Sequence, residues 1–172
     1  MRRLFAPVAT CLVVFSATLS AESEGMAAEA LIEKGQFDAA CPIFESALRQ
    51  EPTSDRLKMG LVRCLLFRRE STDYAVDLRR ALRLLEESIR VYEGIPGQGK
   101  ALAWRHFYSA MALWYLNQSE QALAAFDRAF RLDATLHQAL YNSITILEEL
   151  GRFEEARLRK QTYRRIATID PF

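Results

Sequence analysis

The sequence predicts an all-α fold built from repeated pairs of antiparallel helices. Two observations predict it. Apolar residues recur at three- and four-residue steps, with no alternating run long enough for a strand. The same order of turn, aromatic and small residues also returns along the chain. The composition agrees, because half of the 172 residues are hydrophobic and only 7 are glycine, which excludes both wholesale disorder and a turn-rich all-β chain.

The overall charge excludes partners that bind through a strong electrostatic field. The chain has 23 basic and 22 acidic side chains, a net charge of +1. Such a balance does not attract nucleic acid or an acidic membrane surface. We therefore expect no nucleic-acid partner.

Residues 1–21 have the order of a secretory signal peptide. Arg2 and Arg3 precede an uncharged apolar stretch, and the small residues Ser20 and Ala21 follow it. We expect cleavage there and export, to the periplasm or envelope of a bacterium. An uncleaved anchor is the alternative, because the stretch is close to the shortest length that spans a bilayer. In that case this segment would be the chain's contact with a membrane.

The mature chain, residues 22–172, is expected to be one helical domain with 21 basic and 22 acidic side chains, a net charge of −1. Leu78, Ala81, Leu85 and Ile89 show the helical spacing clearly, and charged residues lie off that stripe. Short breaks rich in Gly, Asn, Ser, Thr and Asp supply the residues that end one helix and cap the next. The segments between them are about 12 to 20 residues long, which predicts seven or eight antiparallel helices.

One pattern recurs within this domain: a turn residue, then small, large and small side chains at helical spacing. The turn residues are Gly35, Asn117 and Gly151. The small–large–small sets after the first two turns are Ala40, Phe44 and Ala47, and Ala122, Phe126 and Ala129. Alanines let two helices approach closely, the phenylalanine fills the space between them, and the turn residue permits a tight reversal.

This pattern resembles the tetratricopeptide repeat family. The resemblance implies a right-handed superhelical solenoid of about four repeats, near residues 22–54, 55–93, 101–134 and 135–170. The second repeat departs from the pattern, because it lacks the turn glycine and carries about seven additional residues. The family's modules bind other proteins, so the resemblance implies a peptide or helix of another protein as partner.

A stripe of bulky side chains on the helix expected at residues 101–116 is the main candidate site. Its members are Trp104, Phe107, Tyr108, Met111 and Trp114. In the family the first helix of each repeat lines the concave groove, so neighbouring first helices would add Met59 and Arg63 on one side and Tyr141 and Asn142 on the other. Aromatic, arginine and asparagine side chains are typical anchors for a bound peptide. The alternative is that the stripe belongs to the hydrophobic core.

Cys41 and Cys64 remain as an even pair once the leader, with Cys11, is removed. They fall on the second helix of the first repeat and the first helix of the second, which are expected to pack together. A disulfide between them is one interpretation. Two small buried hydrophobic side chains that do not meet are the other.

No motif predicts catalysis, a metal or a cofactor. The two histidines, His106 and His137, have no cysteine or carboxylate at metal-ligand spacing. Residues 94–101 match the spacing G-x-x-x-x-G-K of a phosphate loop but end in alanine, without the hydroxyl that such a loop places on magnesium. We therefore expect a loop between helices, no catalytic residues and no cofactor.

The function that these features predict is that of a non-enzymatic interaction module or scaffold in the cell envelope. It would hold a peptide or helix of a partner in the groove of its first helices. Two alternatives stay open from the sequence. One is a self-assembling structural protein whose terminal helices stack end to end. The other is a helical protein that encloses a small apolar ligand among its aromatic side chains.

Overall fold

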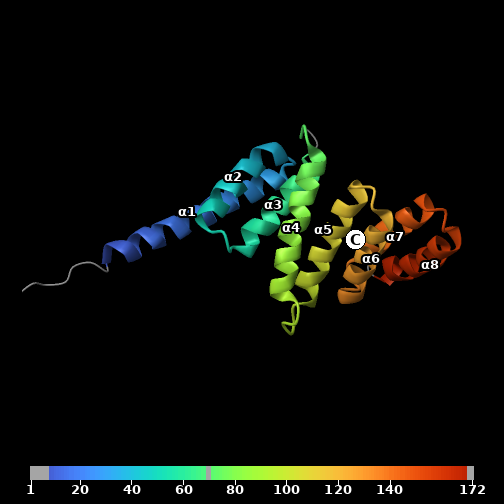
Figure 1. Ribbon diagram of the computed structural model, residues 1–172. Helices are drawn as coiled ribbons and strands as arrows, with labels where there is room; N and C mark the ends of the chain where they lie inside the picture. Colours follow the sequence, from blue (N-terminus) through green and yellow to red (C-terminus); the bar gives the residue numbers. More distant parts are fainter. Residues whose placement is uncertain (1–7, 69–70, 170–172) are drawn as a thin grey trace, which may run out of the picture. The chain divides into compact units, whose positions relative to one another are not determined.

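The computed structural model describes residues 8–68 and 71–169, and it shows α-helices joined by short connections throughout those residues (Figure 1). The prediction of an all-α helical repeat is confirmed. The helices are α1 (Val8–Glu33), α2 (Phe37–Gln50), α3 (Asp55–Phe67), α4 (Tyr74–Tyr92), α5 (Gly99–Tyr115), α6 (Ser119–Leu132), α7 (His137–Glu149) and α8 (Phe153–Ile169).

The chain divides into two compact units between Thr72 and Asp73. The first unit contains α1, α2 and α3, each of which packs against the other two. The second contains α4 to α8, in which each helix packs against the next along the chain, as the order of the ribbons from green to red shows (Figure 1).

Two glycines lie where helices of the first unit approach closely. A Cβ atom on Gly60 of α3 would lie 2.2 Å from Cε1 of Phe44 on α2. A Cβ atom on Gly25 of α1 would lie 2.6 Å from Cδ2 of Leu57 on α3. Gly60 therefore needs a residue without a side chain, because the buried Phe44 ring occupies the space that a methyl group would take, whereas at Gly25 a shift of the end of the Leu57 side chain would relieve the contact.

The small–large–small pattern forms the interior of each unit. Phe44 and Phe126 are fully buried, and so are the four alanines that flank them at helical spacing. The turn residues also have the expected geometry: Gly35, Asn117 and Gly151 have φ angles of 71°, 59° and 72°. The left-handed conformation lets each helix end and the chain reverse, and asparagine is the residue other than glycine that best tolerates it.

Helix α1 continues across the boundary that the sequence predicts between leader and mature domain. The residues before Val8 lie outside the described part of the chain, and Ala21, the last residue of the expected leader, is fully buried in the first unit. Among the residues that the structure describes, no helix has the length and apolarity needed to cross a membrane. Cleavage after Ala21 stays a prediction.

Candidate functional site

The aromatic stripe of α5 divides into a buried part and an exposed part. Phe107 and Met111 each have only 8% of their surface exposed. Trp104 is 40% exposed, and Tyr108 and Trp114 are half-buried. Both sequence interpretations therefore apply, each to different residues: Phe107 and Met111 belong to the core, whereas Trp104 presents a large aromatic surface to solvent.

Phe107 is the centre of an aromatic cluster that supports the exposed ring. Its ring centroid lies 5.5 Å from that of Phe126 on α6 and 5.5 Å from that of Trp104, both with edge-on geometry. Tyr108 lies 5.7 Å from both Trp104 and Phe107. Edge-to-face and tilted pairs at these distances are favourable, so the fully buried Phe126 fixes Phe107, and Phe107 fixes Trp104.

Helix α7 joins the stripe through two side-chain contacts. The Asn142 amide donates a hydrogen bond to the Met111 sulfur at 3.5 Å, and the Trp114 Nε1–H donates to a Glu149 carboxylate oxygen at 2.8 Å. These contacts hold the stripe face of α5 beside α7. We call the exposed and half-buried members, Trp104, Tyr108, Trp114 and Asn142, the α5–α7 surface.

The remaining candidate residues lie elsewhere. Tyr141 is 56% exposed, and its ring pairs with that of Tyr163 on α8 at 5.7 Å. Met59 and Arg63 are half-buried residues of α3 in the first unit. The structure therefore unites the candidates on α5 with Asn142 on α7, and it directs Tyr141 toward α8.

Cys41 of α2 and Cys64 of α3 form a disulfide in the structure, with their Cα atoms 5.5 Å apart. Both side chains are buried beside the contact between Phe44 and Gly60. The bond therefore ties α2 to α3 covalently beside this close contact between the two helices.

A buried arginine that the sequence analysis missed connects α4 to α5. The Arg105 Nε donates to the Ser88 hydroxyl at 2.6 Å, and Nη1 donates to the Ala101 carbonyl at 2.6 Å. Its guanidinium carbon lies 4.0 Å from the centroid of the Tyr92 ring. One signal in the sequence could have found it, since Arg105 is the lone charged residue in the stretch 101–116, and an isolated charge in an apolar helix indicates a specific partner.

His106, the next residue, is half-buried near the ion pair between Arg128 and Glu93, which has a length of 3.0 Å. Burial lowers the pKa of His106 below 6.5, Arg128 lowers this pKa further, and Glu93 opposes the shift. The neutral imidazole is therefore favoured in the folded protein. Among the described residues, no group of three or more His, Cys, Asp and Glu side chains could hold a metal ion.

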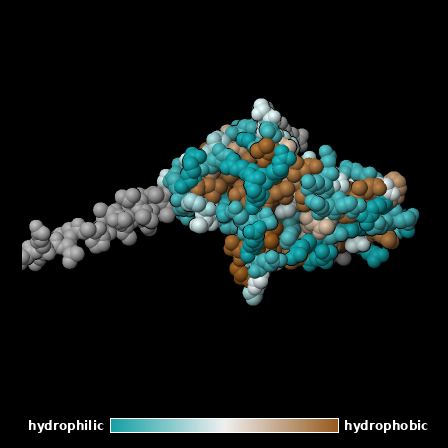
Figure 2. Space-filling view, in the orientation of Figure 1, coloured by the Kyte–Doolittle hydropathy of each residue, from teal (hydrophilic) through white to brown (hydrophobic). Residues whose placement is uncertain are grey.

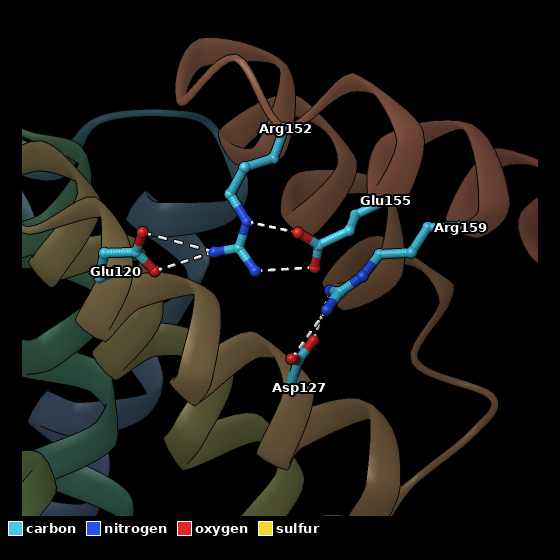
Figure 3. Close-up of polar contacts among 5 residues, drawn as sticks. All are labelled: Glu120, Asp127, Arg152, Glu155 and Arg159. Atoms are coloured by element: carbon cyan, nitrogen blue, oxygen red, sulfur yellow. Dashed lines mark hydrogen bonds and ion pairs between the residues drawn. The ribbon is translucent and has the colours of Figure 1, made fainter.

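Ion pairs fasten α8 to α6 (Figure 3). Arg152 contacts Glu155 at 2.7 Å and Glu120 of α6 at 3.0 Å. Arg159 pairs with Asp127 of α6 through both of its terminal nitrogens, one of them at 2.8 Å. The Arg152 contacts are exposed and contribute little, whereas the Arg159 pair is partly buried and bidentate, a geometry with more effect.

The protein surface around these sites is mixed. Figure 2 shows one face of the molecule, on which hydrophobic side chains form small groups among hydrophilic ones. Val91, near the end of α4, and Ile95, in the connection after it, are exposed hydrophobic residues. Val91, at 63% exposure, gives a matched control for experiments on Trp104, because it is an apolar side chain on another helix.

Comparisons with known proteins agree with the fold. Two tetratricopeptide repeat family models match residues 31–71 and 109–172, which together make up more than half of the chain. No curated protein matches the sequence.

Solved structures of MamA have a similar fold. MamA from Desulfovibrio magneticus RS-1 superposes with a TM-score of 0.72 at 15% identity, over 88% of this chain and 78% of that one. MamA AMB-1 gives a TM-score of 0.60 at 19% identity, over 84% and 72%. A further MamA crystal structure gives 0.58 at 17%, over 84% and 74%. At these identities the likeness concerns the fold alone.

Tetratricopeptide repeats generally serve as non-enzymatic protein–protein interaction modules, which suggests an interaction scaffold. The buried alanine and phenylalanine seams, the left-handed turns and the two family matches lead to one conclusion: this chain belongs to the tetratricopeptide repeat family.

Proposed function

We propose that this protein is an exported scaffold of the bacterial cell envelope that binds a peptide or helix of a partner protein on its α5–α7 surface. The observation that carries the proposal is Trp104, a large aromatic side chain that is 40% exposed while the Phe107 ring beneath it is buried. Exposed aromatic residues on rigid supports are the usual anchors of protein interfaces.

The mechanism is docking onto a preorganised surface. Because Phe107 and Phe126 hold Trp104 and Tyr108 in place, little side-chain freedom is lost when a partner binds. The Trp114 N–H is already bonded to Glu149, so its contribution to a partner is the face of its ring. The Asn142 carbonyl oxygen can accept a hydrogen bond from a partner's backbone.

Photocrosslinking tests this binding directly. A photoreactive amino acid is placed at Trp104, and in a matched control at Val91, in the native envelope. We expect one recurrent partner at position 104 and none of it at position 91. With the purified partner, Trp104→Ala should weaken binding by about tenfold or more, the effect of a hot-spot residue, while Val91→Ala leaves it unchanged. Identical products at both positions, or normal binding by Trp104→Ala, would refute the proposal.

Export is a separate part of the proposal. It is supported by the order of charges and apolar residues in 1–21 and by the disulfide between Cys41 and Cys64, since such bonds persist mainly in oxidising compartments. N-terminal sequencing of the protein from the periplasmic fraction should give Glu22 as the first residue. Intact protein that begins at Met1 and fractionates with the cytoplasm would contradict export.

A further inference from the structure

The first unit has a hollow on its outer side that no described helix fills. It has a volume of about 430 Å³ and is lined by Glu24 and Ala27 of α1 and by Pro42, Ile43 and Ser46 of α2. Its lining is mainly apolar, with the Glu24 carboxylate, bonded to Gln50 at 3.3 Å, at one side.

The hollow lies on the side of α1 and α2 that faces away from α3. On α2, Cys41 and Phe44 point toward α3, where they meet Cys64 and Gly60. Successive helix residues are about 100° apart, so Pro42, Ile43 and Ser46 point away. In a helical repeat this outward side is the one on which a preceding repeat would stack.

In the last repeat, the side of α8 that corresponds to the hollow side of α2 contacts the repeat before it. Ile43 follows the turn residue Gly35 by eight positions, and Arg159 follows Gly151 by the same eight. Arg159 reaches back to Asp127 on the second helix of the preceding repeat. Ile43 therefore stands at a position that contacts a preceding repeat, although no repeat precedes it among the described residues.

The outer side of α8 is the corresponding unstacked surface at the other end of the chain. Arg152, Ala156 and Arg159 face α6 and the interior, so by helical spacing Leu158 and Gln161 face away. Leu158 is 55% exposed.

The two surfaces carry opposite charge. Residues 20–51 contain seven carboxylates and two basic side chains, a net charge of −5. Residues 153–166 contain five basic and two acidic side chains, a net charge of +3. Several of these charged groups form ion pairs within their own unit. The net charge of each surface still sets its electrostatic field at a distance. Opposite fields favour association and determine which surface of one copy meets which surface of the next.

We propose that a second copy of this chain stacks on the first, with the outer side of α8 in one copy against the α1–α2 hollow of the next. The contact joins two different surfaces, so each added copy leaves one of each surface open and the assembly grows as a chain. The register follows from the pair that Arg159 of α8 makes with Asp127 of α6. Ile43 is the counterpart of Arg159, and Gln161 is the counterpart of Asp127, because each lies ten positions after its turn residue, Gly151 or Asn117. Ile43 of one copy therefore lies against Gln161 of the other. This assembly is independent of the α5–α7 surface.

Sedimentation of the full chain, purified after its natural processing, tests the stacking. The average mass should rise with protein concentration without a plateau at dimer, and it should fall with added salt because the opposite charges are screened. A monomer at every concentration, or a dimer that does not grow, would overturn the proposal.

A pair of variants tests the register. Ile43→Arg places a cation in the hollow against the basic α8, and it should weaken association by about tenfold or more. Adding Gln161→Asp recreates between copies the pair that Arg159 makes with Asp127, and it should restore association. Unchanged association of Ile43→Arg, or no restoration by the second change, would refute this register.

Two control variants distinguish this self-association from partner binding on the α5–α7 surface. Val91→Arg adds the same charge at an exposed apolar site on α4 and should leave association unchanged. Trp104→Ala should also associate normally, whether or not partner capture fails. Thermal unfolding followed by circular dichroism checks that each variant is folded. Loss of association in Trp104→Ala but not in Ile43→Arg would move self-assembly to the α5–α7 surface and overturn the stacking.

Discussion

Gly60 is expected to be the position where the smallest possible substitution has a large effect. In Gly60→Ala the new Cβ would lie 2.2 Å from Cε1 and 2.4 Å from Cζ of Phe44. The Phe44 ring is fully buried and beside the disulfide between α2 and α3, so it has no space into which to move. Overpacking of this kind costs roughly 1–3 kcal/mol.

The magnitude follows from two opposed effects. Alanine is favoured over glycine inside a helix by about 1 kcal/mol, whereas a contact more than 1 Å too short forces Phe44 or α3 to shift. We take the overpacking cost as about 3 kcal/mol, the upper end of its range, and subtract the helix preference of alanine, about 1 kcal/mol. The net loss in the free energy of unfolding is then about 2 kcal/mol.

Urea unfolding followed by far-UV circular dichroism measures this loss. Tryptophan fluorescence is less suitable, because both tryptophans lie in the second unit. The matched control is Gly99→Ala at the start of α5, where the nearest atom would be 3.4 Å away, and the expected change is within about 0.5 kcal/mol. Phe44→Leu should reduce the cost of Gly60→Ala when both are combined, because the smaller side chain frees space. A Gly60→Ala protein as stable as the wild type would refute the packing argument.

Three further predictions concern the buried groups. His106→Gln should remove part of the loss of stability on acidification. The folded pKa of His106 lies below its unfolded value of 6.5, so the contribution of His106 to stability is complete above that pH and is lost as the pH falls toward the folded pKa. Urea midpoints between about pH 8 and 5 measure this, and parallel curves for both proteins would contradict it. Reducing the bond between Cys41 and Cys64, which are 23 positions apart, should lower the free energy of unfolding by about 3 kcal/mol. Urea unfolding with and without dithiothreitol measures this, and equal midpoints would contradict the predicted stabilisation. Arg105→Met should cost about 2 kcal/mol through its lost hydrogen bond to Ser88 and its lost ring contact, as followed by tryptophan fluorescence; a change below about 0.5 kcal/mol would contradict this.

The helical pattern was predictable because it depends on local spacing. Gly35, Asn117 and Gly151 adopt the left-handed turns that their residue types indicate, and the seams of Phe44 and Phe126 are buried as their flanking alanines predict. Such features follow from the spacing of side chains along one helix and from the conformations open to single residues.

The irregular second repeat was visible in the sequence, but its consequence was not. The connection between α3 and α4 has no glycine, and the chain divides into its two compact units at this connection, after Thr72. The sequence shows only that the repeat departs from the pattern. Whether neighbouring helices remain in one compact unit depends on the sum of contacts between elements, which spacing along the chain does not reveal.

The division of the aromatic stripe was also beyond the sequence. Phe107 and Trp104 are three positions apart on one helix, yet one is buried and the other is not. The difference arises from Phe126 on α6, whose ring covers Phe107. Arg105 was missed for a similar reason, because its burial depends on Ser88 and Tyr92 of α4. Side chains supplied by a neighbouring helix decide both cases.

The burial of Ala21 has a consequence for the order of events during biogenesis. A processing peptidase needs an extended, accessible segment on both sides of the bond that it cuts. In the folded chain Ala21 is buried within a continuous helix that runs from Val8 to Glu33. The proposed cleavage after Ala21 therefore has to precede folding of the first unit, while the chain is still emerging on the far side of the membrane. Slow processing would give this chain time to fold with its leader attached, and the folded precursor would resist the peptidase.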